Sequence, residues 1–345
     1  MSETSNTRAP ASVTHVELDN FTAFRHLVLS TSPGVNILVG ANGTGKTHIL
    51  KAIYASASPD EPGAKLVRVF LPFGGRHERL AHQSQTAGDI VTRVTFGDTE
   101  VALRFGEPTH QLRTGSIHVT GENGTLPKAV FIPAKEMLSN APGFRSLYAS
   151  REITFDETFA DLIDRAFLPK LKVIPAMVQE QVTRLERLIG GQVVTRGEHF
   201  FLRNEHGELE FNLLAEGLRK LALVCLFLAN GSVSAGTILL WDEPEANLNP
   251  VLIKALVSVL LSLRRLGVQI FLATHDYALL KEFDLQAEPS DGVRYHALYR
   301  DQGDGVVRVN SVDDYSAIHP SSINQAFDDI LERDLDKRMR PVTKT

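Results

Sequence analysis

Short apolar runs separated by polar and glycine-rich segments recur along the chain, and several have the length of a buried strand. Four of them stay almost wholly apolar until their last residues, at 35–39, 129–133, 237–243 and 269–276. Continuous apolar runs of this length are typical of strands that are buried on both faces of a parallel sheet. Helices are expected between and after them, at 48–57, 215–229, 250–266 and 276–283. This alternation predicts an α/β fold with a mostly parallel sheet flanked by helices.

Two stretches interrupt this alternation with other patterns. Residues 58–126 are rich in Gly, Pro and Thr and carry short alternating runs that predict an antiparallel β arm: KLVRVFLP, DIVTRVTF, EVALRF and SIHVT. Residues 143–190 are expected to be mainly helical, and three short strands follow, at 192–196, 199–203 and 208–212. We therefore predict a head with two insertions. The head comprises 1–57, 127–142 and 211–345, the β-rich insertion 58–126, and the mainly helical insertion 143–210.

Further short elements lie near the two ends of the head. Strand-like segments at 14–18 and 27–29 flank the polar turn DNFTAFRH and precede the first buried strand. Near the C-terminus, the sequence YHALYRD…GVVRVNS predicts a hairpin, and a charged helix is expected at about 321–337. These elements complete the head in our prediction.

Composition and charge restrict the classes of protein that fit. The net charge is −5, so no overall basic field indicates binding to nucleic acid. The single cysteine, Cys225, excludes an internal disulfide and fits a reducing compartment. The N-terminal segment lacks the apolar core of a signal peptide, and the longest apolar stretches are too short to cross a bilayer. We therefore expect a cytoplasmic protein without a membrane partner.

A glycine-rich loop, GANGTGKT, directly follows the apolar run 35–39. The pattern Gly-x4-Gly-Lys-Thr between a strand and a helix is typical of a phosphate loop, whose backbone N–H groups surround phosphate oxygens. The helix after it directs its N-terminus at the same anion. We expect Lys46 to reach the β- and γ-phosphates and Thr47 to coordinate Mg²⁺. Nucleotide contacts are predicted for Gly40, Asn42, Gly43, Thr44, Gly45, Lys46, Thr47 and His48.

The apolar strand 237–243 ends in two adjacent carboxylates. Asp242 is expected beside the Mg²⁺ of the phosphate loop, because a carboxylate suits a hard cation. Glu243 points to the other side of the strand and is the candidate base for the attacking water. His275 follows the next buried strand, 32 residues later, and is expected to face the same crevice. The predicted catalytic residues are therefore Glu243, His275 and Lys46, and the predicted metal ligands are Thr47 and Asp242.

Taken as a set, these motifs resemble the ABC-type ATPase class. The residues that carry the resemblance are the phosphate loop with Asn42, the sequence DEP followed by EANLNP, and the sequence THD. The class includes transporter subunits and the RecF, SMC and OLD-type ATPases. The sequence FIPAKEM also resembles the smaller prokaryotic AAA_15/AAA_21 group. The resemblance implies a P-loop NTPase head in which two copies sandwich ATP, each completing the site of its partner with a signature loop.

The signature loop is expected where LLAEGLRKLALV begins the helix 215–229. In the family pattern Leu-Ser-Gly-Gly-Gln, Gly217 matches a glycine, whereas Ala215 replaces the serine that offers a hydroxyl to the γ-phosphate. Glu216 would repel a phosphate unless its side chain turns away, and Arg219 or Lys220 could offset it. NLNP would be the D-loop, with Asn247 and Asn249 as its polar members.

Two further family positions are less regular in this chain. The Q-loop glutamine has no match, since FIPAKEML offers Lys135 and Glu136 instead. In NFTAFRH, either Phe24 or Arg25 is a candidate contact to the adenine, by stacking or by a cation–π interaction. A hairpin aromatic residue packed on the sheet is an equal alternative.

The resemblance implies a Mg²⁺-dependent ATPase that acts as a head-to-tail homodimer, with ATP and Mg²⁺ as its cofactors. Members of the AAA_15/AAA_21 group often work with nucleases in phage defence. Because only 70 residues follow His275 and the head needs them, we expect a nuclease activity to belong to a separate effector protein.

The alternative is a RecF- or SMC-like DNA-repair ATPase that binds duplex DNA itself. The acidic net charge and the absence of a long coiled coil between Lys46 and Gly217, which are 171 positions apart, stand against it. A basic stripe would favour it, if Arg184, Arg187, Arg196 and Arg203 share a face. A transporter subunit is disfavoured, because its signature and Q-loop would be intact.

Overall fold

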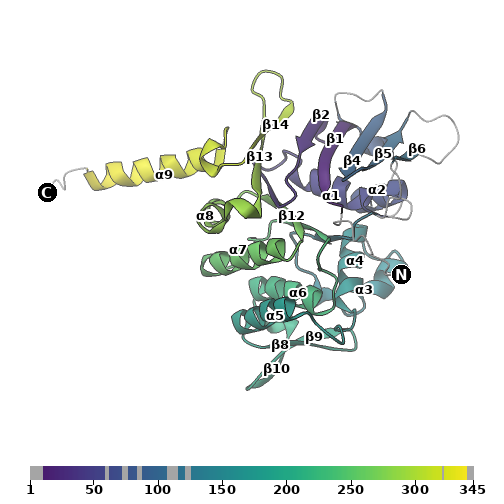
Figure 1. Ribbon diagram of the computed structural model, residues 1–345, viewed down its shortest axis with the longest axis vertical. Helices are drawn as coiled ribbons and strands as arrows, with labels where there is room; N and C mark the ends of the chain where they lie inside the picture. Colours follow the sequence, from purple (N-terminus) through teal and green to yellow (C-terminus); the bar gives the residue numbers. More distant parts are fainter. Residues whose placement is uncertain are drawn as a thin grey trace, which may run out of the picture.

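The central sheet has six strands in the order β14-β13-β3-β12-β11-β7, and it carries the phosphate loop. The computed structural model describes residues 11–58, 62–71, 77–83, 88–106, 116–120, 126–320 and 322–339 (Figure 1). Within them the five strands from β13 to β7 run parallel, and β14 pairs antiparallel with β13. The bounds are β3 Val35–Gly40, β7 Ala129–Ile132, β11 Ile238–Asp242, β12 Gln269–Thr274, β13 Val293–Arg300 and β14 Val307–Val312. The predicted α/β class and the C-terminal hairpin are therefore confirmed.

Alternate residues of the central sheet face two separate cores. Ile37 and Trp241 join one core together with helices α6 (Glu216–Ala229), α7 (Pro250–Arg265) and α8 (Tyr277–Gln286). Leu38, Leu240 and Phe271 join the other core, with helix α1 (Lys46–Ser56) and an antiparallel sheet. Because these strands are apolar on both faces, both layers exclude water from the sheet. Trp241 is fully buried, as expected of a core residue.

A second, antiparallel sheet has the strand order β2-β1-β4-β5-β6. Its bounds are β1 Val13–Phe21, β2 Phe24–Ser30, β4 Ile90–Phe96, β5 Thr99–Phe105 and β6 Ser116–Thr120. β1 pairs with β2 on one side and with β4 on the other, so the sheet continues across the division that we predict between residues 57 and 58. The predicted β arm therefore continues from the strands before the phosphate loop.

The strand that we predict in KLVRVFLP is wrong, because its first six residues, 65–70, belong to helix α2 (Pro62–Phe70). The side chains that this helix buries are those of Pro62, Lys65, Leu66 and Val69, and Gly63 is buried as well. Their i, i+3, i+4, i+7 spacing is that of one helix face. The helical periodicity therefore outweighs the short alternation that suggested a strand.

The residues between β7 and β11 are mainly helical, as predicted, and a small three-stranded sheet lies between the third and fourth of these helices. The helices are α3 Phe144–Ala149, α4 Glu157–Ala166, α5 Ala176–Ile189 and α6, and the strands are β8 Gln192–Arg196, β9 His199–Asn204 and β10 Gly207–Glu210. A C-terminal helix, α9 (Ser322–Met339), leaves the head as a separate rod, drawn in yellow in Figure 1. No helix among the described residues is both long and apolar enough to cross a membrane.

Candidate active site

The phosphate loop lies between the end of β3 and the start of α1, as the sequence predicts. Helix α1 begins at Lys46, directly after Gly45, whose backbone is left-handed at φ 89°. A Cβ atom at Gly45 would lie 2.4 Å from the Phe24 ring, so the position accepts only glycine. Phe24 is itself fully buried beneath the loop. It supports the loop and is not available to stack on a base, which leaves Arg25 as the candidate of that pair.

Lys46 lies inside the curve of the loop. Its ammonium donates hydrogen bonds to the carbonyl oxygens of Gly40 at 2.7 Å and Ala41 at 3.1 Å. Burial lowers the pKa of Lys46, while the carboxylates of Glu243 and Asp242 act in the opposite direction. The ammonium is thus held where the loop and two acidic residues meet.

Thr47 and Asp242 lie side by side, although 195 positions separate them in the sequence. The Thr47 hydroxyl donates to a carboxylate oxygen of Asp242 at 2.9 Å. Burial raises the pKa of Asp242, and the hydrogen bond from Thr47 opposes this shift. A hydroxyl and a carboxylate are hard oxygen donors of the kind that Mg²⁺ binds through one or two protein ligands. The pair therefore fits the predicted metal site.

Glu243 and His275 also meet, from the ends of neighbouring strands β11 and β12. Nδ1 of His275 and a carboxylate oxygen of Glu243 are 2.8 Å apart, with side chains 47% and 25% exposed. Glu243 has a left-handed backbone, φ 46°, and its N–H donates to the carbonyl of Ala273 at 2.9 Å. This backbone turns the Glu243 side chain out of the strand toward solvent and His275. The three predicted catalytic residues, Lys46 among them, thus lie at one edge of the sheet.

His48 is the predicted loop residue that the structure places elsewhere. Its ring packs edge-on against Phe70 of α2, with centroids 5.4 Å apart. Burial lowers the pKa of His48 to about 4, so the imidazole is neutral at pH 7. A nucleotide contact from His48 stays a prediction only for its backbone N–H at the helix start.

The β13–β14 hairpin contributes a residue to the loop that sequence reasoning missed. The Arg300 guanidinium donates to the carbonyl oxygen of Gly43 at 3.1 Å. Burial lowers the pKa of His82, and the positive charges of Arg25 and Arg300 lower it further. A cavity of about 430 Å³ opens here, lined by loop residues, by the end of β13 and by Pro320 and Ile323.

The signature helix α6 packs on the segment that follows Glu243. A Cβ atom at Gly217 would lie 2.8 Å from Leu248 and 2.9 Å from the carbonyl oxygen of Asn247. Ala215, the N-cap of α6, is exposed. Gly217 thus permits close contact between the signature helix and the D-loop, while the start of the helix faces outward.

Lys220 makes contacts that the sequence analysis did not predict. It is 2% exposed, and its ammonium donates to the carbonyl oxygens of Ala246 at 2.7 Å and Glu243 at 3.2 Å. Burial lowers the pKa of Lys220, although Glu216 and other nearby carboxylates raise it. The ammonium therefore holds the turn after the candidate base, and its charge lies near that of Glu216.

Arg219 has another partner as well, in the expected Q-loop segment. Its guanidinium lies 3.1 Å from the carboxylate of Glu136, whose side chain is 3% exposed. Burial raises the pKa of Glu136, and the charge of Arg219 opposes the shift. Lys135 lies over the Phe155 ring at 5.1 Å. This segment thus ties β7 to the signature helix.

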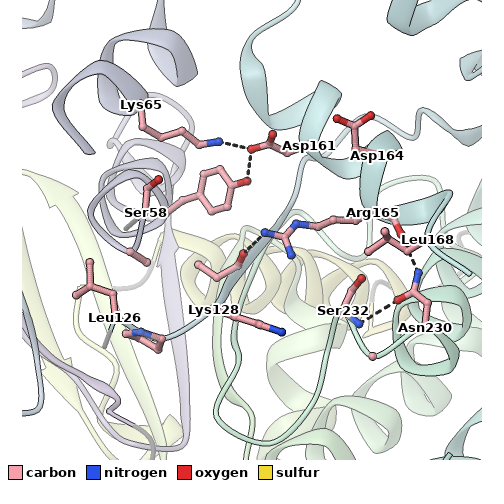
Figure 2. Close-up of a pocket in the computed structure, with 15 residues that line it drawn as sticks. Ser58, Lys65, Leu126, Lys128, Asp161, Asp164, Arg165, Leu168, Asn230 and Ser232 are labelled. Atoms are coloured by element: carbon pink, nitrogen blue, oxygen red, sulfur yellow. Dashed lines mark hydrogen bonds and ion pairs between the residues drawn. The ribbon is translucent and has the colours of Figure 1, made fainter. Parts of the chain in front are cut away.

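A separate polar pocket lies at the other ends of α1 and α6. Figure 2 shows this cavity of about 560 Å³, lined in part by Tyr54 at the end of α1 and by Asn230 and Ser232 just after α6. Lys65 of α2 and the Tyr54 hydroxyl both bind Asp161 of α4. These contacts join the head to the helical segment at a point distant from the phosphate loop, because α1 has the loop at its opposite end.

Comparison with protein families gives one match over most of the chain. The model AAA_21, described as "AAA domain, putative AbiEii toxin, Type IV TA system", matches residues 35–281. This range begins at β3 and ends beyond His275, so it includes the phosphate loop, Asp242, Glu243, His275 and the signature helix.

The chain is also similar to bacterial proteins described as "DNA replication and repair protein RecF". The protein from Thermomicrobium roseum is 27% identical over 184 residues, which are 51% of this chain and 45% of the relative. That from Nitrosococcus oceani is 52% identical over 113 residues, 30% of this chain and 28% of the relative. The chain thus matches less than half the length of these relatives.

Solved structures with a similar fold are SMC heads. The SmcHead bound to the C-winged helix domain of ScpA aligns with a TM-score of 0.55 at 13% identity, over 87% of this chain and 97% of the other. An Smc head with an extended coiled coil, bound to the C-terminal domain of ScpA derived from Pyrococcus furiosus, gives 0.51 at 12% identity, over 93% and 99%. At these identities the likeness is one of fold.

Proposed function

The chain is a P-loop ATPase of the RecF- and SMC-like ABC type and belongs to the AAA_21 family, and from this premise we propose that it hydrolyses Mg²⁺-ATP as a dimeric switch. The observation that carries the proposal is the convergence of three motifs distant in sequence at one sheet edge. The Thr47–Asp242 and Glu243–His275 contacts bring the members of that set together.

Each residue has a defined task in this proposal. Lys46 and the loop N–H groups bind the phosphates, and Thr47 and Asp242 hold Mg²⁺, which neutralises charge on the β- and γ-phosphate oxygens when bound. Glu243 accepts a proton from water as the water oxygen attacks the γ-phosphorus and the bond to the bridging oxygen breaks. His275 hydrogen-bonds Glu243 and orients its carboxylate.

The position of the signature helix supports the proposed dimer. Ala215 is exposed at its start, whereas Gly217 is covered by the D-loop of the same copy. We propose that this outward-facing helix start binds the ATP of a second, head-to-tail copy through its backbone N–H groups. In this proposal Gly217 does not contact ATP. It permits the close packing against the D-loop that fixes the position of the helix start.

Two substitutions test the proposal. Glu243→Gln should retain ATP and trap the dimer, with hydrolysis reduced by about 10²-fold or more. Lys46→Ala should abolish ATP binding, measured by calorimetry. Wild-type hydrolysis in Glu243→Gln would remove Glu243 as the base, and undiminished ATP affinity in Lys46→Ala would contradict the phosphate-loop assignment.

The output of the switch has two candidates. The first is a separate effector protein, with a nuclease in phage defence as the candidate class, which fits the AAA_21 description as a putative toxin. The second is direct binding to duplex DNA, which the RecF relatives favour. The basic stripe does not strengthen the second, because Arg196 and Arg203 both pair with Glu208 and Arg184 binds Ser258.

A purification and a DNA-binding assay together distinguish the two outputs. Isolation of the native complex from its own cells should yield a stoichiometric second protein under the first candidate. Duplex binding by the isolated chain, weakening steeply between 50 and 200 mM salt as phosphate contacts require, would support the second. An isolated chain that binds no DNA excludes the second candidate.

A further inference from the structure

The carboxylate of Glu245 is buried close to the candidate base and has no task in the mechanism given above. The residue is 8% exposed and lies in the turn after β11, residues 243–248, two positions after Glu243. One carboxylate oxygen, Oε1, accepts a hydrogen bond of 2.6 Å from the Thr274 hydroxyl. The other, Oε2, is buried and has no hydrogen-bond partner among the described residues. A buried carboxylate with an unsatisfied oxygen is costly, so packing alone does not explain this side chain.

Thr274 is the last residue of β12 and directly precedes His275. It is fully buried, and its hydroxyl oxygen accepts a hydrogen bond of 3.0 Å from the Asp276 N–H. A hydroxyl has a single hydrogen to donate, and the hydrogen of this one is directed at Glu245. Thr274 thus spends its only donor on the turn that carries Glu243.

Three contacts join the turn after β11 to the end of β12. The first is the backbone hydrogen bond from the Glu243 N–H to the Ala273 carbonyl oxygen. The second is the contact between Glu243 and His275, whose side chains are both partly exposed. The third is the hydrogen bond from Thr274 to Glu245, which is buried. Because water competes with the second contact and not with the third, the third is the side-chain contact that can fix the two turns to each other.

The turn after β11 has a constrained backbone that is held from two sides. Glu243 and Asn247 both have left-handed backbones, which persist only where surrounding contacts impose them. From the side of α6, the Lys220 ammonium holds two carbonyl oxygens of the turn. From the side of β12, the hydrogen bond to the Glu245 side chain holds it. Loss of the second hold would leave the first in place, so the turn would shift without losing its fold.

We propose that Glu245 is a positioning residue, whose hydrogen bond with Thr274 locks the turn that carries Glu243 to the turn that carries His275. The lock keeps the base and the histidine in the geometry that water activation requires. This inference rests on the proposed function, in which Glu243 is the base. In this role Glu245 acts as an acceptor and does not touch the reacting atoms, so its loss lowers the catalytic rate rather than ATP affinity.

Thr274 is the better position for the first test, because its substitution removes no charge. Burial lowers the pKa of Lys46 in the phosphate loop, and the charges of Glu243, Asp242 and Glu245 raise it. A substitution of Glu245 would therefore also alter the surroundings of the loop. Thr274→Val keeps the shape of the side chain, removes only the hydroxyl, and leaves all of these charges in place.

Steady-state ATPase assays and calorimetry measure the effect of Thr274→Val. The matched control is Thr92→Val, at a fully buried position of β4 whose hydroxyl has no partner among the described residues. We expect kcat to fall by about tenfold in Thr274→Val while ATP affinity stays within about threefold, and neither quantity to change in Thr92→Val. Thr274→Ser, which keeps the hydroxyl, should restore most of the lost rate. Wild-type kcat in Thr274→Val, or a loss of affinity in place of rate, would overturn the proposal.

A double-mutant cycle shows whether Thr274 acts through Glu245. Glu245→Met removes the acceptor together with its unsatisfied oxygen, and it serves as the test by itself where Thr274→Val does not fold. If the two side chains act through their hydrogen bond, the double variant should lose about tenfold in kcat, like each single variant. A loss of about a hundredfold, the product of two separate effects, would overturn the proposal.

Amide hydrogen exchange without nucleotide separates this inference from the proposed function. The N–H groups of Ala246 and Leu248 form hydrogen bonds within the turn after β11. They should exchange about tenfold faster in Thr274→Val and at the wild-type rate in Thr92→Val. Unchanged exchange in Thr274→Val would show that the hydrogen bond does not hold the turn. Wild-type hydrolysis in Glu243→Gln would remove the base and leave the exchange result standing, so the two proposals fail separately.

Discussion

Replacing Lys220 by methionine tests whether the signature helix positions the candidate base. Methionine keeps most of the length of the side chain but removes the ammonium that binds the carbonyl oxygens of Glu243 and Ala246. A hydrogen bond to a charged group contributes about 1.5–3 kcal/mol, so the two bonds together contribute about 3–6 kcal/mol. Because burial of the ammonium already costs part of this, as its lowered pKa indicates, we expect a net loss of about 2–4 kcal/mol in unfolding free energy.

The same substitution should affect catalysis more than binding. Two residues of this turn, Glu243 and Asn247, have left-handed backbones at φ 46° and 60°, a conformation that persists only where surrounding contacts impose it. Without Lys220 the turn relaxes and the Glu243 carboxylate moves. We expect the catalytic rate to fall by about tenfold or more, while ATP affinity stays within about threefold, because the phosphate loop belongs to other elements.

Urea unfolding measures the stability, and steady-state ATPase assays with ATP titration separate rate from binding. Lys254→Met, at an exposed position of α7, is the matched control and should change neither quantity. A Lys220→Met protein that loses stability but keeps its catalytic rate would refute the positioning role and leave Lys220 with a structural role only.

Three further substitutions address other parts of the site. Gly217→Ala should lower the hydrolysis rate by about tenfold in an ATPase assay, because the added Cβ would meet Leu248 at 2.8 Å and shift the D-loop; an unchanged rate would contradict this. Asp242→Asn should raise the Mg²⁺ concentration for half-maximal hydrolysis by about tenfold or more, and an unchanged Mg²⁺ titration would remove Asp242 as a ligand. His48 has a pKa of about 4 in the folded chain against 6.5 unfolded, so the unfolded state takes up its proton first and stability is lost as the pH falls through this window. In His48→Gln the fall in unfolding free energy between pH 7 and 4.5 should be smaller by about 2 kcal/mol, and an identical pH profile would contradict the burial of His48.

The residues at strand ends could be predicted from the sequence because a parallel sheet brings the ends of its strands together. Asp242, Glu243 and His275 each follow an apolar run, and the sheet order places β11 beside β12. The positions of Lys46 and Thr47 followed from the loop pattern alone. Local pattern and topology were sufficient for these residues.

Lys220 and Arg300 could not be predicted in the same way. The ammonium of Lys220 reaches carbonyl oxygens 23 and 26 positions away, and Arg300 binds a loop carbonyl 257 positions away. Such contacts depend on how helices and hairpins pack, which no short motif encodes. Helix α2 was missed for a different reason, since its short apolar segment fits both an alternating and a helical period.

The contacts of α6 have a consequence for the kinetics of a dimer. Gly217 and Lys220 lie on the same face of this helix, one against the D-loop and the other against the carbonyl oxygen of the candidate base. The helix start that would contact the ATP of the second copy is therefore rigidly joined to the base that acts on the ATP of its own copy. In the proposed dimer, occupancy of one site would then alter the turnover of the other, and the dependence of rate on ATP concentration should be sigmoidal rather than hyperbolic.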